Sequence, residues 1–282
     1  MFNVKLFYKL SVVLIVLVLV GVNYTSTEAL AAPALNNRAV SQASNAPLPG
    51  YTKLIFQDDF NTFNPVWHSG EWWTREGNMS TEENNEQEAY APANVTVQNG
   101  MLNITAKKQT VSVEGTTYGY TSGLVETGGD QYGYANKFTF QYGYMEARIK
   151  IPAGQGLWPA FWSWPANFQD PPETDFMEIL GNNPQADYMT VHYTGGSKQY
   201  VLNSVNLSKN FHIYGCEWTS TYIAWFVDGV QVARFSNATL VSHQPMYLIL
   251  NLAVGGDWPG AVSDSVLPAT MQVDWVRVYQ KK

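Results

Sequence analysis

The chain has 282 residues, of which 45% are apolar and 14% aromatic, enough for one large all-β domain or two smaller ones. Charged residues make up only 14%, the formal net charge is −7, and no Lys- or Arg-rich run occurs, which argues against nucleic acid as a partner. The 10 Trp and 17 Tyr residues are expected mostly in a core or on a sheet surface, although flat rings in an acidic chain also suit contacts with sugars.

The N-terminal segment has the three parts of an export signal. Lys5 and Lys9 precede an apolar run from Leu10 to Val22, and the small-residue pattern at 29–31 (Ala-Leu-Ala) follows. A membrane anchor is the alternative, but the run is shorter than the about 20 residues of a spanning helix. Residues 1–31 are therefore predicted to be a cleaved signal peptide of a secreted, extracellular protein.

The next segment, residues 32–50, is rich in Ala, Asn, Ser and Pro and is expected to be a flexible linker. Cys216 is the only cysteine in the sequence, so the chain cannot form an internal disulfide. A secreted domain without disulfides needs a large core or a metal for stability. We expect this domain to span residues 51–282.

From Tyr51 onward, short stretches of alternating apolar residues are separated by turn residues. Asn99-Gly100 and Asp228-Gly229 each lie between two such stretches, which is a strong signal for a β-hairpin. No long segment has convincing helical periodicity. The pattern predicts a single sandwich of two antiparallel sheets. The clearest strand candidates are 95–106, 142–152, 222–235 and 271–279.

A dense group of acids occurs at Glu173, Asp175 and Glu178. On a regular strand Glu178 would point away from the other two and carry an unpaired carboxylate into the core, at a high cost. A β-bulge around 176–177 would return it to the same face. The carboxyl groups of Glu173 and Glu178 could then approach to about 5–6 Å, close to the spacing of retaining glycosidases.

A helix start is the alternative for this segment, because Asp170, Pro171 and Glu173 resemble an N-cap, a first-turn proline and a capping-box acid. On a helix, however, the three acids would share no tight face. Tryptophans at even spacing nearby can also line one face of a strand. Trp residues beside a row of carboxylates favour a sugar cleft; they are Trp158, Trp162 and Trp164.

The sequence resembles glycoside hydrolase family 16, and within it the laminarinase-type branch. The family motif there is Glu-x-Asp-x-x-Glu, matched by Glu173-Thr-Asp175-Phe-Met-Glu178. The match covers about residues 51–281. Further segments follow the family's order: YGYMEARIKIP (142–152), GQGLWPAFW (154–162), VHY (191–193), FHIYGCEW (211–218), WFVDG (225–229), LNLAVGGDWPG (250–260) and VDWVRVY (273–279).

The resemblance implies a concanavalin-like β-jelly roll, a sandwich of two antiparallel sheets whose concave face carries the cleft. It implies an endo-acting, retaining hydrolase of β-1,3-glucan or mixed β-1,3/1,4-glucan. It assigns Glu173 as the nucleophile, Glu178 as the acid/base and Asp175 as the helper between them. The charge of Asp175 would help to keep Glu178 protonated until it donates.

The resemblance also marks cleft-lining positions. Together with the three tryptophans above, the expected substrate-binding residues are Asn85, Trp158, Trp162, Trp164, His192, Asn251 and Trp258. No cofactor is expected for catalysis, but members of the family often hold a structural calcium. Asp274 aligns with the usual C-terminal ligand, and Asp59 and the backbone of Gly100 are the expected companions.

Some positions depart from the family pattern. Glu126 stands where Arg is common, Pro171-Pro172 replaces the usual residues before the nucleophile, and Thr174 stands where Ile is usual. The first two change the glycone side of the cleft and leave the catalytic acids in place.

Three alternative functions stay open: a transglycosylase, a hydrolase of another β-linked polysaccharide such as a galactan or a bacterial exopolysaccharide, and a non-catalytic carbohydrate-binding jelly roll. The three acids argue against the last, and the scarcity of Lys and Arg near the motif argues against sulfated galactans. The expected partner is a β-glucan, bound by a monomer that has no membrane contact once the signal is cleaved.

Overall fold

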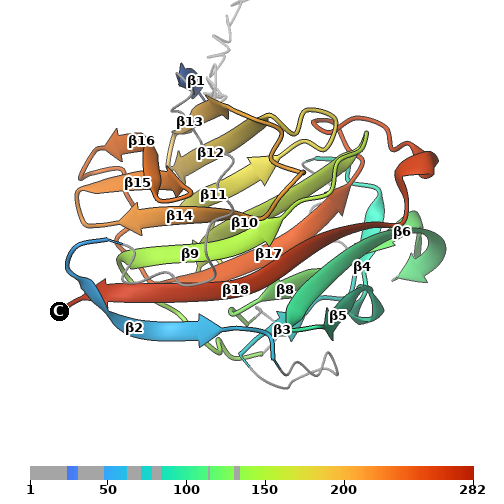
Figure 1. Cartoon of the computed structure of the whole chain (residues 1–282), viewed down its shortest axis with the longest axis horizontal. Helices are drawn as coiled ribbons and strands as arrows, with labels where there is room; N and C mark the ends of the chain where they lie inside the picture. Colours follow the sequence, from blue (N-terminus) through green and yellow to red (C-terminus); the bar gives the residue numbers. More distant parts are fainter. Residues whose placement is uncertain (1–23, 31–47, 62–70, 78–83, 114, 130–133) are drawn as a thin grey trace, which may run out of the picture.

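The structure is a computed structural model, and it describes residues 24–30, 48–61, 71–77, 84–113, 115–129 and 134–282 (Figure 1). The apolar run of the signal peptide and nearly all of the linker lie outside these residues. In the described part the helical structure consists of two short 3₁₀ segments, Pro92–Asn94 and Asp264–Val266, so no helix there is long enough to cross a membrane.

Two sheets pack face to face. The sheet that carries the site has the order β1 (Tyr24–Leu30), β13 (Gly196–Asn203), β12 (Ala186–Tyr193), β11 (Glu173–Ile179), β10 (Leu157–Pro165), β17 (Met246–Val254), β8 (Leu124–Glu126) and β3 (Trp73–Thr74).

The second sheet has the order β16 (Val230–Ser236), β15 (Tyr222–Val227), β14 (His212–Trp218), β9 (Gly143–Lys150), β18 (Ala269–Lys281), β6 (Met101–Val113), β7 (Thr116–Ser122) and β4 (Glu88–Tyr90). Two strands join it off this path: β2 (Tyr51–Asp58) pairs with β18, and β5 (Val95–Gln98) pairs with β6.

Most strand pairs are antiparallel, as the sequence predicts, but β1 pairs with β13 and β4 with β7 in parallel. The two sheets are therefore mixed. The parallel partners of β13 and β7 are short segments from the N-terminal part of the chain, which reach their edges from a distance and not through a tight turn.

Both predicted hairpins are present. Asn99 and Gly100 have φ values of 57° and 69°, and Asp228 and Gly229 have 52° and 78°, the left-handed pair that a two-residue type I′ turn requires. The hairpins join β5 to β6 and β15 to β16. Short polar turns thus set the register of neighbouring strands.

The core lies between the two sheets and takes one side of each strand. On β10, Leu157 and Phe161 are fully buried in this core, whereas Trp158, Trp162 and Trp164 alternate to the other side. This alternation is the predicted one. It leaves the outer, concave face of the first sheet rich in indole rings.

Candidate active site

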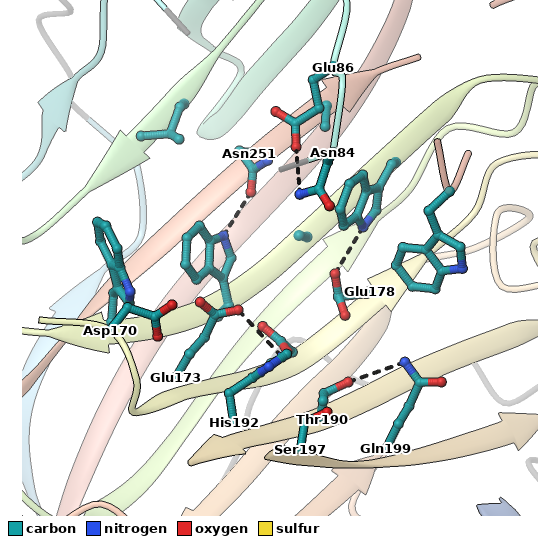
Figure 2. A pocket seen from close by; sticks show the side chains of 18 of the residues that line it. Asn84, Glu86, Asp170, Glu173, Glu178, Thr190, His192, Ser197, Gln199 and Asn251 are labelled. Carbon is teal, nitrogen blue, oxygen red and sulfur yellow. Dashed lines mark hydrogen bonds and ion pairs between the residues drawn. The ribbon is translucent and has the colours of Figure 1, made fainter. Parts of the chain in front are cut away.

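The concave face of the first sheet holds a cavity of about 820 Å³. Figure 2 shows Glu173 and Glu178 entering it from one strand, with Asn84, Glu86 and Asn251 on the opposite side. The lining residues come from seven segments: Asn84, Glu86, Tyr90, Leu124, Trp158, Ala160, Trp162, Trp164, Asp170, Glu173, Asp175, Glu178, Thr190, His192, Ser197, Gln199, Asn251, Ala253 and Trp258.

The three predicted acids lie together on the cleft side of β11. Asp175 pairs with Thr190 on β12, while Glu178 pairs with Tyr188, so the register shifts by one residue between them. This is the bulge that the sequence predicts, and the two residues at 176–177 that make it are buried in the core. All three carboxyl groups therefore face the same cavity.

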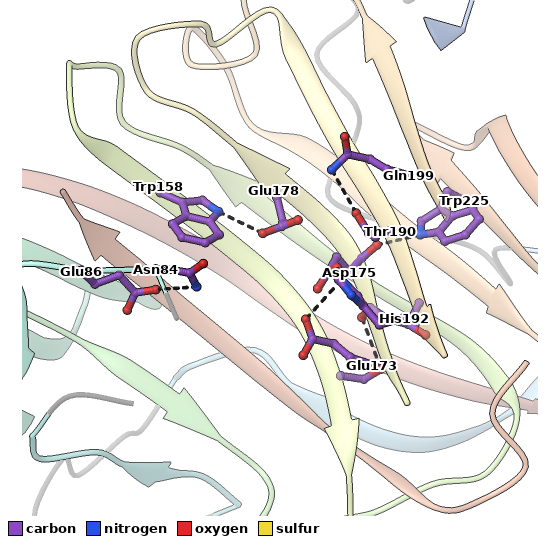
Figure 3. A network of polar contacts seen from close by, with 12 residues as sticks. Asn84, Glu86, Trp158, Glu173, Asp175, Glu178, Thr190, His192, Gln199 and Trp225 are labelled. Carbon is purple, nitrogen blue, oxygen red and sulfur yellow. Dashed lines mark hydrogen bonds and ion pairs between the residues drawn. The ribbon is translucent and has the colours of Figure 1, made fainter. Parts of the chain in front are cut away.

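His192 lies beside two of these acids. It pairs directly with Glu173 across the strands, and its Nε2 lies 3.1 Å from Oδ2 of Asp175 and 3.7 Å from Oε1 of Glu173 (Figure 3). Ligand atoms of these three residues all fall within 4.8 Å of one another, the one such group of His, Cys, Asp or Glu found in the described ranges. A divalent cation could occupy the same atoms, in competition with substrate.

Burial raises the pKa of every acid in the row. The pKa of Asp175 rises to about 7, and those of Glu173 and Glu178 rise well above their usual range, with the charge of Asp175 adding to both. Like charges this close cannot all ionise, so the row keeps a proton near neutral pH. The charge of His192 opposes this rise in the pKa of both Glu173 and Glu178, and its ring also contacts Asp175. Among the described acids of the row, Glu178 is the one that makes no ion pair with His192.

Aromatic side chains form a wall on each side of the acids. Nε1 of Trp158 donates to Oε1 of Glu178 at 3.0 Å, and the Trp158 ring meets Trp258 edge-on at 5.0 Å. Trp258 in turn meets Tyr188 at 4.9 Å. Such fixed rings offer flat apolar faces to pyranose rings.

The other wall lies toward β17. Nε1 of Trp162 donates to Oδ1 of Asn251 at 2.8 Å, and Asn251 donates to the Tyr90 hydroxyl at 3.0 Å. The rings of Trp162 and Trp164 lie 6.2 Å apart. These bonds fix the indole of Trp162 in this wall of the cavity.

Six of the seven predicted substrate-binding residues line the cavity. Asn85 is the exception: its amide donates to Asp257 at 2.9 Å, and its neighbour Asn84 lines the cavity instead. The backbone of Asn85 has a left-handed φ of 54°. At this turn of the loop the side chain of Asn84, and not that of Asn85, lines the cavity.

Sequence reasoning missed several lining residues. Thr190 could have been found, because it lies two positions before His192 on the same strand and must share its face. The sequence around Asp170 indicates only a possible helix cap. Ser197 and Gln199 have no local signal, since their place depends on the pairing of β13 with β12. Glu86 has none either, because its loop is held against the end of β17 by distant backbone bonds.

The departure at position 126 has a partner in the structure. Nε of Arg75 lies 2.5 Å from Oε1 of Glu126, and both are on segments at the β3/β8 edge of the cleft sheet. An acid at this position therefore does not leave an uncompensated charge. Proline residues 171 and 172 lead directly into β11.

The predicted metal positions lie near the point where β18 changes partner. β18 pairs with β6 up to Val273 and with β2 from Val276, which places Asp274 beside the ends of both strands, near Gly100 and Asp59. Oδ2 of Asp274 lies 2.6 Å from Arg148, and Oδ1 of Asp59 lies 3.1 Å from Arg277. Both carboxylates are thus paired with arginines, and a hard cation at this place stays a prediction.

Comparison with known proteins agrees with this geometry. Residues 82–277 match the profile of the glycosyl hydrolases family 16. The chain belongs to this family. It is 36% identical over 245 residues to the endo-1,3-1,4-beta-glycanase ExsH of Rhizobium meliloti (strain 1021), covering 79% of this chain and 51% of that one. It is also 31% identical over 196 residues to a keratan-sulfate endo-1,4-beta-galactosidase of Sphingobacterium multivorum, covering 63% and 44%.

Among solved structures, the laminarinase catalytic domain of Thermotoga maritima MSB8 is 33% identical with a TM-score of 0.72, covering 82% of this chain and 98% of that domain. The relatives thus place the chain in the laminarinase-type branch and its fold among the family's jelly rolls. The chain spans about half the length, or less, of the curated relatives it matches first.

Proposed function

We propose that this chain is a secreted glycoside hydrolase that cleaves β-1,3-glucan, or mixed β-1,3/1,4-glucan, internally and with retention. The observation that carries the proposal is the bulged row of Glu173, Asp175 and Glu178 in an aromatic cleft beside His192. A double displacement needs two carboxyl groups in a sugar cleft, one as the nucleophile and one as the acid/base.

In the first step the carboxylate of Glu173 attacks the anomeric carbon. Glu178 gives its proton to the glycosidic oxygen, the bond to the leaving chain breaks, and a glycosyl ester on Glu173 remains. Asp175, held by His192, keeps negative charge near Glu178 and so favours the protonated acid before this step.

In the second step Glu178, now a carboxylate, takes a proton from water as the water oxygen attacks the anomeric carbon. The ester to Glu173 breaks, and both carboxyl groups return to their starting states. Two inversions give retention. Neither step requires a cofactor.

The glucan assignment is supported by the walls of the cleft and by its charge. Trp158, Trp162 and Trp258 offer stacking faces for sugar rings, and His192 is the one basic side chain among the lining residues of the described cavity. Four acids besides Glu173 also line it, so a sulfated or otherwise anionic chain would be repelled.

A transglycosylase uses the same two residues and passes the ester to a sugar hydroxyl instead of water. Activity on another β-linked polysaccharide is the second candidate, favoured by the Arg75–Glu126 pair and by Pro171-Pro172, which change the glycone side. A non-catalytic binding role is disfavoured, since such a protein has no use for three clustered acids with raised pKa values.

Product analysis tests the proposal. Purified protein is incubated with laminarin, lichenan, agarose and carrageenan under one set of conditions, and reducing ends are measured. Release from laminarin or lichenan, as a ladder of oligosaccharides and initially as the β-anomer, is expected. Activity on a galactan with none on either glucan contradicts the substrate and leaves the catalytic residues intact.

We also infer that the protein is an extracellular monomer, released by cleavage near Ala31, and that its partner is the polysaccharide itself. We also infer a structural calcium at Asp274 with Asp59 and the carbonyl of Gly100. It would join the beginning and the end of the domain, which no disulfide does.

A further inference from the structure

The bulge that turns Glu178 into the cleft also interrupts the hydrogen-bond ladder of its strand. Asp175 pairs with Thr190 and Glu178 pairs with Tyr188, so the two residues at 176–177 oppose a single residue of β12. At such a bulge some ladder bonds are lost. Backbone groups beside it must find other partners, because a buried amide without one is costly.

The amide of Glu178 finds its partner in a side chain from the next strand. Its N–H donates to Oδ1 of Asp187, with 3.3 Å between nitrogen and oxygen. Asp187 pairs with Ile179 on β11 and is completely buried. Along β12, Thr190 and His192 line the cleft, so Asp187 takes the opposite face, toward the core.

The carboxyl group of Asp187 makes one hydrogen bond in the described part of the chain. Within the described ranges Oδ2 of Asp187 has no hydrogen-bond partner, and its bond to the Glu178 amide is the one that the carboxyl makes. Burial raises the pKa of Asp187 well above its usual range, and the charge of Glu178 adds to this. The other titratable group that senses it is Tyr214, from β14.

Burying a carboxyl group in a core is unfavourable compared with burying an aliphatic side chain of similar volume. Met189 and Val191, on the same face of the same strand, are apolar as expected. Asp187 is therefore an exception on this face, and its one hydrogen bond is with the backbone of Glu178, the residue that must donate a proton.

We propose that Asp187 is a positioning residue for the proposed hydrolysis, holding the peptide N–H of Glu178 and thereby the direction in which its carboxyl group enters the cleft. The inference rests on the proposed function. Proton donation depends on the aim of the acid, and small misplacements of a catalytic group lower rates strongly.

The test compares two variants on two substrates. Asp187→Val removes the acceptor, and Asp187→Asn keeps a neutral oxygen acceptor of the same shape. One substrate is laminarin, whose leaving group needs the acid; the other is an aryl β-oligoglucoside with a dinitrophenolate leaving group, which does not. We compare kcat/KM, which reports the first step, because Glu178 serves both substrates equally in the second. For Asp187→Val we expect kcat/KM on laminarin to fall about 10- to 100-fold, part of what general acid catalysis contributes, and kcat/KM on the aryl glycoside to fall less than about threefold. Asp187→Asn should recover most of the laminarin rate.

Val191→Ala is the matched control, because it disturbs the same face of β12 without touching the Glu178 amide. Any loss there should be equal on the two substrates. If Asp187→Val does not fold, Asp187→Ser, with a shorter and weaker acceptor, takes its place with the same selective loss expected. Equal losses on both substrates, or no loss, overturn the role of Asp187. A wild-type protein that cleaves neither substrate overturns the proposed function instead.

Discussion

Nε1 of Trp158 donates a hydrogen bond to Oε1 of Glu178, and the two atoms lie 3.0 Å apart. The donor comes from β10, where Ala160 is the strand partner of Glu178. A donor favours the ionised carboxylate, so this bond lowers the pKa of Glu178 while burial and the charge of Asp175 raise it. Trp158 thus stabilises the carboxylate form of Glu178, which the second step requires, besides lining the cleft.

Replacing Trp158 by Phe should keep the ring and remove the donor. The pKa of Glu178 then rises further, and the basic limb of the pH profile of kcat/KM moves to higher pH, because the protonated acid persists longer. The profile with laminarin measures this shift. Trp258→Phe removes an indole that makes no recorded bond to Glu178 and should leave the limb where it is; a limb unmoved in Trp158→Phe would contradict the argument.

Glu173→Ala should lower kcat on laminarin by at least about 10³-fold, because no glycosyl ester can form without the carboxylate. Azide can enter the space left by the side chain and attack the anomeric carbon directly. Added azide should therefore restore turnover of an activated aryl glycoside and give a glycosyl azide of inverted configuration, which nuclear magnetic resonance identifies. Wild-type-like activity of the alanine variant would remove Glu173 from the mechanism.

Glu178→Gln should affect natural glucan far more than an activated aryl glycoside in the first step, since only the former needs proton donation. A loss of about 10²- to 10⁴-fold on laminarin is expected from general acid catalysis. In the wild type, activity should fall as pH rises through the raised pKa of Glu178, and fall at low pH as the nucleophile is protonated. Equal losses on the two substrates would speak against the assignment.

Much of the fold and the acid row could be predicted because both follow from local rules. Asn-Gly and Asp-Gly turns fix hairpins, and a strand that must keep Glu178 out of the core needs a bulge. Asp187 could not be predicted in the same way. Its position reads as a core residue of β12, and only the register with β11 brings it to the Glu178 amide.

The metal positions show the same limit. Asp274 follows from the family motif, but its ion pair with Arg148 depends on the register of β18 with β9, which is irregular between Val273 and Trp275. The Arg75–Glu126 pair likewise joins two short strands at a sheet edge. Contacts between distant segments are set by packing, and no local pattern encodes them.

Chelation should lower the melting temperature if calcium binds at Asp274. At about 100 times the dissociation constant, a ligand stabilises by about 2.7 kcal/mol, or about 5–10 °C for a domain of this size. Asp274→Asn should melt at the same temperature with and without chelator. Asp264→Asn, which changes an exposed acid paired with Lys108, should keep the calcium response. An unchanged wild-type melting temperature, with no calcium by elemental analysis, means that the site is absent.

Cleavage near Ala31 would also remove β1, which pairs with β13 from Tyr24 to Leu30. A chain that begins at Ala32 should stay active, because the catalytic acids lie on β11 and the cavity is lined by β13 and not by β1. The loss in stability should be small. Glu28 and Lys198 lie 3.1 Å apart, but the Glu28 side chain is 54% exposed, and such pairs contribute about 0–1 kcal/mol.

Leu30 is half-buried against the core and adds about 1 kcal/mol. The chain that begins at Ala32 should therefore melt within about 8 °C of one that begins at Tyr24, as measured by calorimetry. Size-exclusion chromatography of the shorter chain shows whether the bare edge of β13 recruits another copy, as exposed edges can. Lys198→Ala in the longer chain separates the ion pair from the strand itself. A drop of more than about 10 °C, or loss of activity on laminarin, would make β1 an integral strand of the mature domain and place cleavage before Tyr24.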